Sequence, residues 1–235
     1  MPLFLKHRLT GVRERMEDPG CDRRKLRNTY AQFRAVNALV AGWGQIYRRL
    51  LRPAAGRRRT TVLDIGFGGG DIPARLARWA ARDGLELAIT AIDTDPRALA
   101  FVRRGRFPSA IAFRRESVAG LLERGERFDV VASNHLLHHL EESEIERLCD
   151  RTRRLARRLV VHSDIVRSDL AWLGFAALTG PFFHRSFIVA DGLTSIRRSF
   201  TLSELRRLAP RGWRLERVFP YHQLLIHRAA EGDRD

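Results

Sequence analysis

Short apolar runs alternate with amphipathic stretches through the middle of the chain. Residues 61–65 form an apolar run that leads into a glycine-rich turn, and the apolar positions of 72–80 recur at helical spacing. This strand–turn–helix unit predicts an α/β fold of the nucleotide-binding type. Further strand-like runs follow at 86–93, 110–115, 127–133 and 159–164.

A helical stretch precedes this alternation. Apolar residues recur at steps of three and four between positions 26 and 47, and Asp22 can cap the start of such a helix. Gly42 and Gly44 weaken the pattern, so one helix and two helices with a bend are both compatible with it. Residues 53–59 are expected to link this stretch to the first strand.

The most apolar segment, 170–183, follows the last of these strand-like runs. It is shorter than the about 20 residues that a bilayer-spanning helix needs, and Gly180 interrupts it. Two roles fit the segment. It is either a core helix between strands or a cap over an apolar acceptor, with Phe182, Phe183 and His184 at the rim of the pocket.

The remaining C-terminal positions predict a loop, a helix and two strands. Residues 191–200 are polar and are expected to form a loop. Thr201 and Glu204 have the spacing of a capping box at the start of the last helix. Residues 213–219 and 223–227 are expected to be the closing strands.

The turn after the first strand carries four glycines, at positions 66, 68, 69 and 70. Asp64 ends the strand, and Asp71 occupies the place of the third glycine of a dinucleotide fingerprint. Two carboxylates here would repel a pyrophosphate but would suit a ligand that carries an ammonium group and a cationic sulfur. For Asp71 alone, a role as a helix-capping acid is equally compatible.

Asp93 closes the second strand-like run and is followed by Thr94 and Asp95. An acid a little over ~20 residues past the glycine turn is where this architecture holds a ribose diol. A carboxylate can accept hydrogen bonds from both hydroxyls at once. The alternative role, capping the next helix, suits Asp95 better than Asp93.

Polar residues also follow the fourth strand-like run. Asn134 and His135 come directly after it, at the edge where the parallel strands of such a fold meet their ligand. His138 and His139 come next. Neighbouring residues of a helix point about 100° apart, and no third ligand follows at a useful spacing, so no metal site is expected.

The string VLDIGFGGGD resembles the first motif of the class I S-adenosylmethionine (SAM)-dependent methyltransferases, and the similarity continues in order over residues 60–165. It implies a Rossmann-like, seven-stranded, mostly parallel sheet with an antiparallel last strand and helices on both faces. Residues 1–59 would be an N-terminal helical segment packing on the core. Residues 60–235 would be the SAM-binding domain, with a helical cap inserted at about 166–200 after the fifth strand.

The resemblance also implies site residues. In the family an acidic residue commonly holds the adenine amino group where this chain has Ser117, so Ser117 or Glu116 would have to serve, together with the backbone of Val118. Tyr30, Phe33 and Asn37 are candidates for pocket walls, because an N-terminal helical segment often covers the pockets in this family. The residues expected to bind the cofactor are Asp64, Gly66, Phe67, Gly68, Gly70, Asp71, Asp93, Thr94, Ser117, Val118 and Asn134.

The charge of the chain is strongly basic, with a formal net charge of +16. Clustered basic residues would indicate a polyanionic partner. Here the excess is almost all arginine, spread over every expected helix, and no basic tract is interleaved with aromatic residues. The pattern favours solvated helix faces over a nucleic-acid interface. A hydrophobic content of 44% and the lack of an apolar N-terminal leader favour a cytoplasmic enzyme.

Transfer of a methyl group to a hydroxyl benefits from a general base, and histidine is the natural one. His135 and His139 are expected to be catalytic because they follow the fourth strand, while His162 and His184 are further candidates. We therefore predict a SAM-dependent methyltransferase that O-methylates a small, fairly apolar acceptor, an aromatic or polyketide-like metabolite. Homodimer formation stays open.

A narrower resemblance rests on the strings ERMEDPGCD and DGLTSIRRSFTLSEL, which are similar to bacterial methyltransferases encoded beside type III polyketide synthases. Three alternatives also remain. They are a methyltransferase that binds RNA or another nucleic acid, a nicotinamide-dependent oxidoreductase, and a catalytically silent scaffold with a SAM-binding fold.

Overall fold

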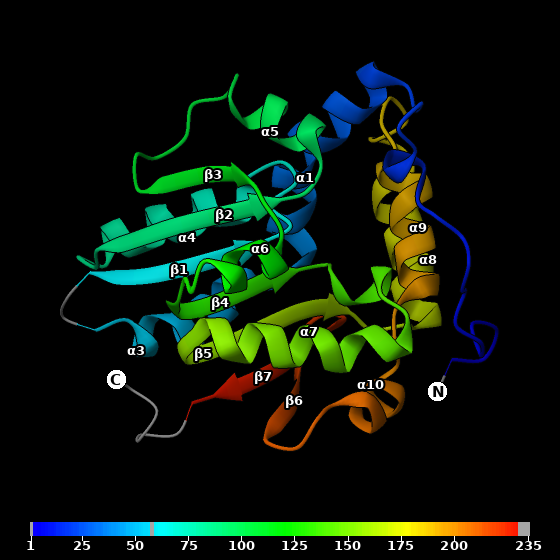
Figure 1. The fold of residues 1–235 in the computed structure, drawn as a ribbon. Helices are drawn as coiled ribbons and strands as arrows, with labels where there is room; N and C mark the ends of the chain where they lie inside the picture. Colours follow the sequence, from blue (N-terminus) through cyan, green and yellow to red (C-terminus); the bar gives the residue numbers. More distant parts are fainter. Residues whose placement is uncertain (1, 57–58, 230–235) are drawn as a thin grey trace.

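Seven strands form one sheet at the centre of the computed structural model, which describes residues 2–56 and 59–229 (Figure 1). The strands are β1 (Thr60–Ile65), β2 (Leu87–Asp93), β3 (Ile111–Arg115), β4 (Phe128–Asn134), β5 (Ala156–Ile165), β6 (Trp213–Val218) and β7 (His222–Arg228). Their order is β3-β2-β1-β4-β5-β7-β6. Strands β1 to β5 are parallel and β7 is antiparallel to both neighbours, which confirms the expected sheet.

Helices cover both faces of this sheet (Figure 1). They include α4 (Asp71–Arg82), α5 (Pro96–Val102), α6 (Val118–Glu123), α7 (Glu142–Leu155) and α10 (Leu202–Leu208), and the 3-10 turn η3 (Leu137–His139). Alternate residues of β1 serve the two faces. Val62 belongs to the apolar cluster that contains Leu76 of α4, whereas Leu63 packs with Leu121 of α6 and Leu155 of α7. A strand buried on both faces is typical of a parallel sheet.

The N-terminal helical stretch is divided at Gly42. Helix α1 (Arg23–Val40) is capped by the Asp22 carboxylate, which accepts hydrogen bonds from two backbone N–H groups. Gly42 has a φ of 65°, and a Cβ there would lie 2.7 Å from the side chain of Val218. Of the two versions that the sequence allowed, the structure has the one with a bend. The chain continues as α2 (Trp43–Ile46), the π-helical turn η2 (Tyr47–Leu51) and α3 (Arg52–Ala54), and Arg57 and Arg58 of the expected linker lie outside the described residues.

Two helices stand beyond the carboxyl ends of the parallel strands, α8 (Asp169–Thr179) and α9 (Ile188–Arg198) (Figure 1). The expectation of a loop over residues 191–200 was wrong, because most of this stretch is helical. Gly192 obscured the helical pattern. The structure gives it a packing role, since a Cβ there would lie 2.3 Å from the ring of Phe175 in α8. Within the described ranges, no helix combines the length and the apolarity needed to cross a bilayer.

The first residues of the chain run along the outside of these two helices and are tied to them (Figure 1). The backbone N–H of Leu5 donates to Asp169 at 3.0 Å, and that of Leu9 donates to the Arg197 carbonyl at 2.9 Å. The segment ends in the 3-10 turn η1 (Arg15–Glu17), where the N–H of Met16 donates to Asp191 at 3.0 Å. We call residues 2–17 the strap.

Arg167 joins the strap to the domain. Its side chain is almost fully buried at 2% exposure. The guanidinium donates to the carbonyls of Leu5 at 3.0 Å and Ser199 at 2.9 Å, and it pairs with the Glu204 carboxylate at 2.6 Å. Glu204 also completes the expected capping box with Thr201. A buried arginine with this many acceptors cannot be removed without leaving polar groups unpaired.

We predict that Arg167→Met lowers the free energy of unfolding by about 3 kcal/mol, because it leaves a carboxylate and several carbonyls without their donor. Urea unfolding followed by circular dichroism measures the change. Arg207→Met removes an exposed arginine from α10 and should cost less than about 0.5 kcal/mol. Equal midpoints for the two variants would contradict the role given to Arg167.

Candidate active site

A cavity of about 540 Å³ lies between the carboxyl edge of the sheet and the helices α1, α8 and α9. The register of the sheet brings strand ends to its floor. Ile65 pairs with Ile92 on one side and with Ser133 on the other, so Asp93 and Asn134 come next to the glycine turn. Strand β7 runs the opposite way, and it therefore begins at this same edge with His222, opposite Ile165.

Three carboxylates form the floor of the cavity, of which Asp64 and Asp71 are buried and Asp93 is partly buried. Asp64 is 2% exposed, and its Oδ2 atom has no hydrogen-bond partner. Burial raises the pKa of Asp64 to about 8, and the neighbouring Asp71 and Asp93 contribute in the same direction. Burial also raises the pKa values of Asp71 and Asp93. The surroundings of the floor therefore do not favour ionisation of all three carboxylates, and a cationic ligand would supply the missing positive charge.

Donors of the protein hold two of these carboxylates in place. One oxygen of Asp93 accepts from the N–H of Gly68 and the other accepts from the N–H of Asp95, both at 2.9 Å. Asp71 accepts from the amide of Asn37 at 3.1 Å. Asp95 itself caps α5, as the sequence indicated. The acids are thus oriented before any ligand arrives.

The glycine turn is shaped for close approach of a ligand. Gly66 has a φ of 78°, and a Cβ there would point into open space, so the backbone itself faces the cavity. Gly70 has a different role. Its φ is 73°, and a Cβ there would lie 2.9 Å from the ring of Phe107, so Gly70 is required for packing.

The structure does not bring every expected residue to the cavity. Gly70, Thr94, Ser117 and Val118 are not among its lining residues. The Ser117 hydroxyl accepts from the N–H of Gly120 at the start of α6, and Glu116 pairs with Arg124 at 2.6 Å. Their contact with an adenine group stays a prediction. The expected residues that do line the cavity are Asp64, Gly66, Phe67, Gly68, Asp71, Asp93, Asn134, His135 and His139.

The side and roof of the cavity are largely apolar. Phe33 and Val36 come from α1, Phe175 from α8, and Ile188 and Ile196 from α9. Of the two roles that the sequence left open for 170–183, the geometry supports a cap, because residues of α8 line the cavity. The residues that were expected at the rim of the pocket lie away from the cavity. Phe182 is 72% exposed, and Phe182, Phe183 and His184 do not line the cavity.

His135 lies on the floor beside Asn134. It has a φ of 55°, which is uncommon for a residue with a side chain. Its Nε2 lies 2.9 Å from Nε2 of His222, so the two rings share a hydrogen bond. Burial lowers the pKa of His135 to about 3, and His222 adds to the effect. His135 is therefore neutral at physiological pH.

His162, a further candidate base, is fully buried away from the cavity. It is hydrogen-bonded to Ser133 at 2.8 Å and to Thr152 at 3.1 Å, and it stacks on Trp213. These contacts give it a structural role.

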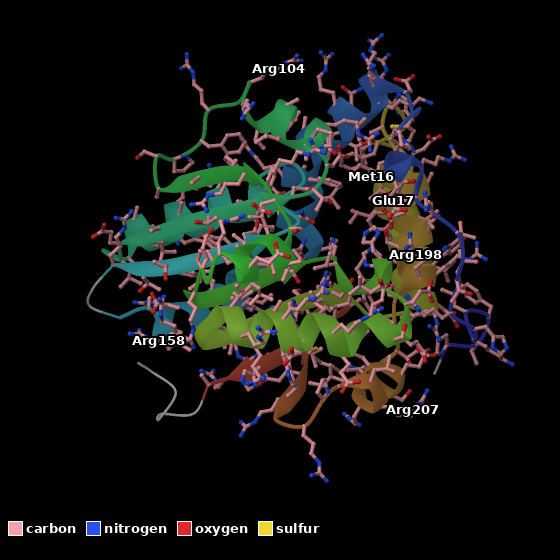
Figure 2. All side chains as sticks on the ribbon, viewed as in Figure 1. Met16, Glu17, Arg104, Arg158, Arg198 and Arg207 are labelled. Carbon is pink, nitrogen blue, oxygen red and sulfur yellow. The ribbon has the colours of Figure 1, made fainter. Side chains whose placement is uncertain are left out.

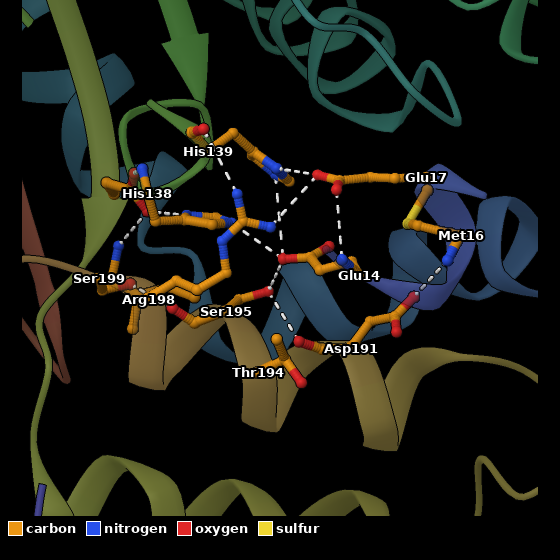
Figure 3. A network of polar contacts seen from close by, with 12 residues as sticks. Glu14, Met16, Glu17, His138, His139, Asp191, Thr194, Ser195, Arg198 and Ser199 are labelled. Carbon is orange, nitrogen blue, oxygen red and sulfur yellow. Dashed lines mark hydrogen bonds and ion pairs between the residues drawn. The ribbon is translucent and has the colours of Figure 1, made fainter. Parts of the chain in front are cut away.

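A cluster of carboxylates and histidines stands at the side of the cavity (Figure 3). His138 is buried between two acids, with its Nδ1 2.7 Å from Asp164 and its Nε2 3.3 Å from Glu14. Burial alone would lower the pKa of His138, but Asp164 and Glu14 outweigh it and raise the pKa to about 9. Burial alone would raise the pKa of Glu14, but the two histidines and Ser195 lower it to about 2.

His139 stands next to this pair with its side chain 29% exposed. Its Nδ1 is hydrogen-bonded to the Glu17 carboxylate. The guanidinium of Arg198 lies 3.4 Å from Glu17 and donates to the His139 carbonyl at 3.3 Å. Arg198 thereby ties α9, the strap and η3 together around the cluster (Figure 3).

Sequence reasoning missed Glu14, Glu17 and His222 as site residues. Glu14 and Glu17 lie in the string ERMEDPGCD, which carries the narrower resemblance, but no periodic pattern placed them at the cavity. A signal for His222 did exist. An antiparallel last strand begins at the carboxyl edge of the parallel strands, so its first residues had to lie near the ligand.

Comparisons with known proteins agree with this geometry. Residues 62–158 match the family model described as a methyltransferase domain. Over this part of the chain, the match agrees with the resemblance to the class I SAM-dependent methyltransferases that the sequence indicated. A comparison with curated protein sequences finds no match.

Solved structures resemble this methyltransferase at low sequence identity. The plantazolicin methyltransferase BpumL in complex with S-adenosylhomocysteine (SAH) is 14% identical with a TM-score of 0.59, over 88% of this chain and 95% of that one. Human N-acetylserotonin methyltransferase in complex with SAM is 12% identical with a TM-score of 0.59, over 88% and 56%. An O-methyltransferase family protein from Burkholderia thailandensis is 15% identical with a TM-score of 0.58, over 87% and 59%. At these identities the likeness shows the fold.

SAM is the cofactor that the resemblance implies, and the floor of the cavity fits it. An ammonium group would supply the partner that Oδ2 of Asp64 lacks. A sulfonium charge would offset the remaining acids. Gly66 would allow the backbone to approach the ligand closely.

We predict that the affinity for SAH rises with pH between about pH 6 and about pH 7.5, by up to about tenfold per unit. In the free protein Asp64 is protonated below its pKa of about 8, and an ammonium group binds the ionised form. Lower pH therefore opposes binding. Isothermal titration calorimetry across this range measures the slope.

Asp64→Asn should bind SAH more weakly at the upper end of this range and show a shallower slope, because the titrating group is gone. Glu123→Gln changes an exposed acid on α6 and should reproduce the wild-type slope. A wild-type affinity that does not depend on pH would refute the role of Asp64.

Proposed function

We propose that this enzyme transfers the methyl group of SAM to an oxygen atom of a small, largely apolar acceptor, such as an aromatic or polyketide-like metabolite. One observation carries the proposal. A single cavity runs from an acidic floor at the glycine turn to apolar walls contributed by α1, α8 and α9, with a histidine cluster at its side.

The acidic floor is the proposed site of the cofactor. Asp64 and Asp71 would face the ammonium group of its amino-acid end. Asp93 would accept from the ribose hydroxyls, because its carboxylate is already oriented by Gly68 and Asp95. Asn134 is held by the indole N–H of Trp43 at 2.8 Å and lies beside them. When bound, SAM supplies an electrophilic methyl group, and the broken carbon–sulfur bond leaves its electron pair on sulfur.

The apolar part of the cavity is the proposed site of the acceptor. Aromatic and aliphatic side chains such as Phe33, Phe175 and Ile188 would desolvate a ring or an alkyl chain. Holding the acceptor oxygen in line with the methyl carbon and the sulfur can itself supply much of the rate enhancement. The neighbours named for plantazolicin and N-acetylserotonin also act on small molecules, which agrees with the proposal.

His139 is the proposed group that promotes loss of the acceptor proton. His138 already carries a proton at neutral pH, because its pKa is raised to about 9. His135, with a pKa lowered to about 3, is a weak base and is better placed to position Asn134 and the acceptor. His139 lines the cavity and is oriented by Glu17. The sequence predicted that both His135 and His139 are catalytic, and we propose that His139 promotes loss of the proton while His135 has a positioning role.

The basic charge of the chain does not favour a nucleic-acid substrate. Arg104, Arg158 and Arg207 point outward from separate parts of the molecule (Figure 2). The proposed cofactor site itself is lined by acids, which repel phosphate.

We predict that Asp93→Ala lowers the affinity for SAH at least about tenfold, because two hydroxyl groups lose their shared acceptor. Titration calorimetry at constant pH tests this. Asp150→Ala alters an exposed acid on α7 and serves as the control. An unchanged affinity for the Asp93 variant would remove the ribose assignment.

We predict that His139→Ala lowers turnover by about 100-fold or more, the usual effect of losing a proton-transfer group, with SAH affinity within about threefold of wild type. The assay follows isotope-labelled methyl transfer from SAM to a panel of phenols and other hydroxylated aromatic compounds. His184→Ala, which removes an exposed histidine outside the cavity, should keep wild-type turnover. Full turnover in the His139 variant would contradict the assignment, and SAH binding without turnover on any acceptor would favour a silent scaffold.

A further inference from the structure

Two histidines and one glutamate point their ligand atoms toward one another at the side of the cavity. Glu14, His138 and His139 each offer one ligand atom, and these atoms all lie within 4.8 Å of one another. From Oε1 of Glu14, Nε2 of His138 is 3.3 Å away and Nε2 of His139 is 4.0 Å away. Ligands about 2.0–2.1 Å from a tetrahedral zinc ion lie about 3.4 Å apart, so small shifts would complete such a site.

The sequence predicted no metal site for two reasons, and neither of them holds in the folded structure. Neighbouring histidines on a regular helix would point apart, but His138 and His139 lie in the short 3-10 turn η3, and their ring centroids are 4.2 Å apart. A third ligand was absent at useful spacing along the chain. The strap supplies it from more than a hundred positions away, in Glu14.

Each of the three groups also has the outer partner that metal ligands usually have. Nδ1 of His138 is hydrogen-bonded to Asp164 at 2.7 Å, and Nδ1 of His139 is hydrogen-bonded to Glu17. Both rings therefore turn Nε2 toward Glu14. The Glu14 carboxylate accepts from the Ser195 hydroxyl at 2.5 Å (Figure 3). Carboxylate–histidine pairs of this kind fix the tautomer and direction of a metal-ligating imidazole.

The charges of the cluster match a divalent cation. Three carboxylates, Glu14, Glu17 and Asp164, and one guanidinium, Arg198, leave two net negative charges when both imidazoles are neutral. A metal ion would displace the proton that His138 carries in the free protein. All three ligand residues line the cavity. A tetrahedral ion held by three protein groups keeps one open position, as catalytic zinc sites do.

We propose that Glu14, His138 and His139 bind a divalent transition-metal ion such as Zn²⁺ at the side of the cavity. The donor set of two imidazole nitrogens and one carboxylate oxygen suits zinc or iron(II) better than magnesium. Because all three ligand residues line the cavity, an acceptor bound there could reach the open position. On the basis of the proposed function, an acceptor hydroxyl bound there would ionise more readily, and His139 would act as a ligand in promoting that ionisation.

Metal binding can be measured without turnover. The full-length protein is stripped with a chelator and titrated with Zn²⁺ by calorimetry, and Co²⁺ is added separately to record the visible absorption of a tetrahedral site. We expect one ion per chain and a tetrahedral cobalt spectrum. Glu14→Gln and His139→Gln should each weaken Zn²⁺ binding at least about 100-fold, and Asp164→Asn about 10-fold to 100-fold through His138.

His184→Gln is the matched control, because it removes an exposed imidazole outside the cluster, and its Zn²⁺ affinity should equal that of the wild type. SAH affinity and circular dichroism are measured for every variant, so loss of fold or of the cofactor site is seen separately. Zn²⁺ affinity that is the same in wild type and Glu14→Gln would overturn the proposal, as would a loss in His184→Gln. Zn²⁺ binding without methyl transfer would leave the metal site standing and count against the proposed function alone.

Discussion

Uncompensated negative charge at the ends of two neighbouring strands is the constraint on which the site depends. The parallel register brings Asp64 and Asp93 to the same edge of the sheet, and the first turn of α4 adds Asp71. Burial disfavours the ionised carboxylates. The pKa of Asp64 is raised because no neighbouring positive group in the described part of the chain compensates for this burial. A cationic ligand offsets this penalty, whereas a pyrophosphate would increase it. The acidic floor thus distinguishes a SAM site from a dinucleotide site on a similar sheet.

The second requirement is closure of the cavity by segments that are distant in sequence. The strap brings Glu14 and Glu17 to the cavity, α9 brings Ser195 and Arg198, and η3 brings the two histidines. Arg167 and Asp191 fix the strap on the domain. The histidine cluster at the side of the cavity is thus completed by residues of the strap. The cofactor end is formed by the ends of β1, β2 and β4 and by the glycine turn, so it depends on fewer distant segments.

This difference explains which parts could be predicted from the sequence. The strands, the glycine turn and the helix break at Gly42 follow from periodicity and backbone geometry over a few residues. Asp93 and Asn134 were found because strand ends in such a sheet meet at one edge. Helix α9 was missed, since Gly192 reads as a loop residue until its contact with Phe175 is known. Glu14 was missed because its partners are more than a hundred residues away.

The most direct test of the account is a crystal structure of the protein with bound SAH at neutral pH. The account predicts that the ammonium group of SAH lies within hydrogen-bond distance of the Asp64 carboxylate and that both ribose hydroxyls donate to Asp93. The sulfur should point toward the apolar walls and the histidine cluster. SAH bound elsewhere, or with its amino-acid end turned away from Asp64 and Asp71, would contradict the central claim that buried negative charge defines this site.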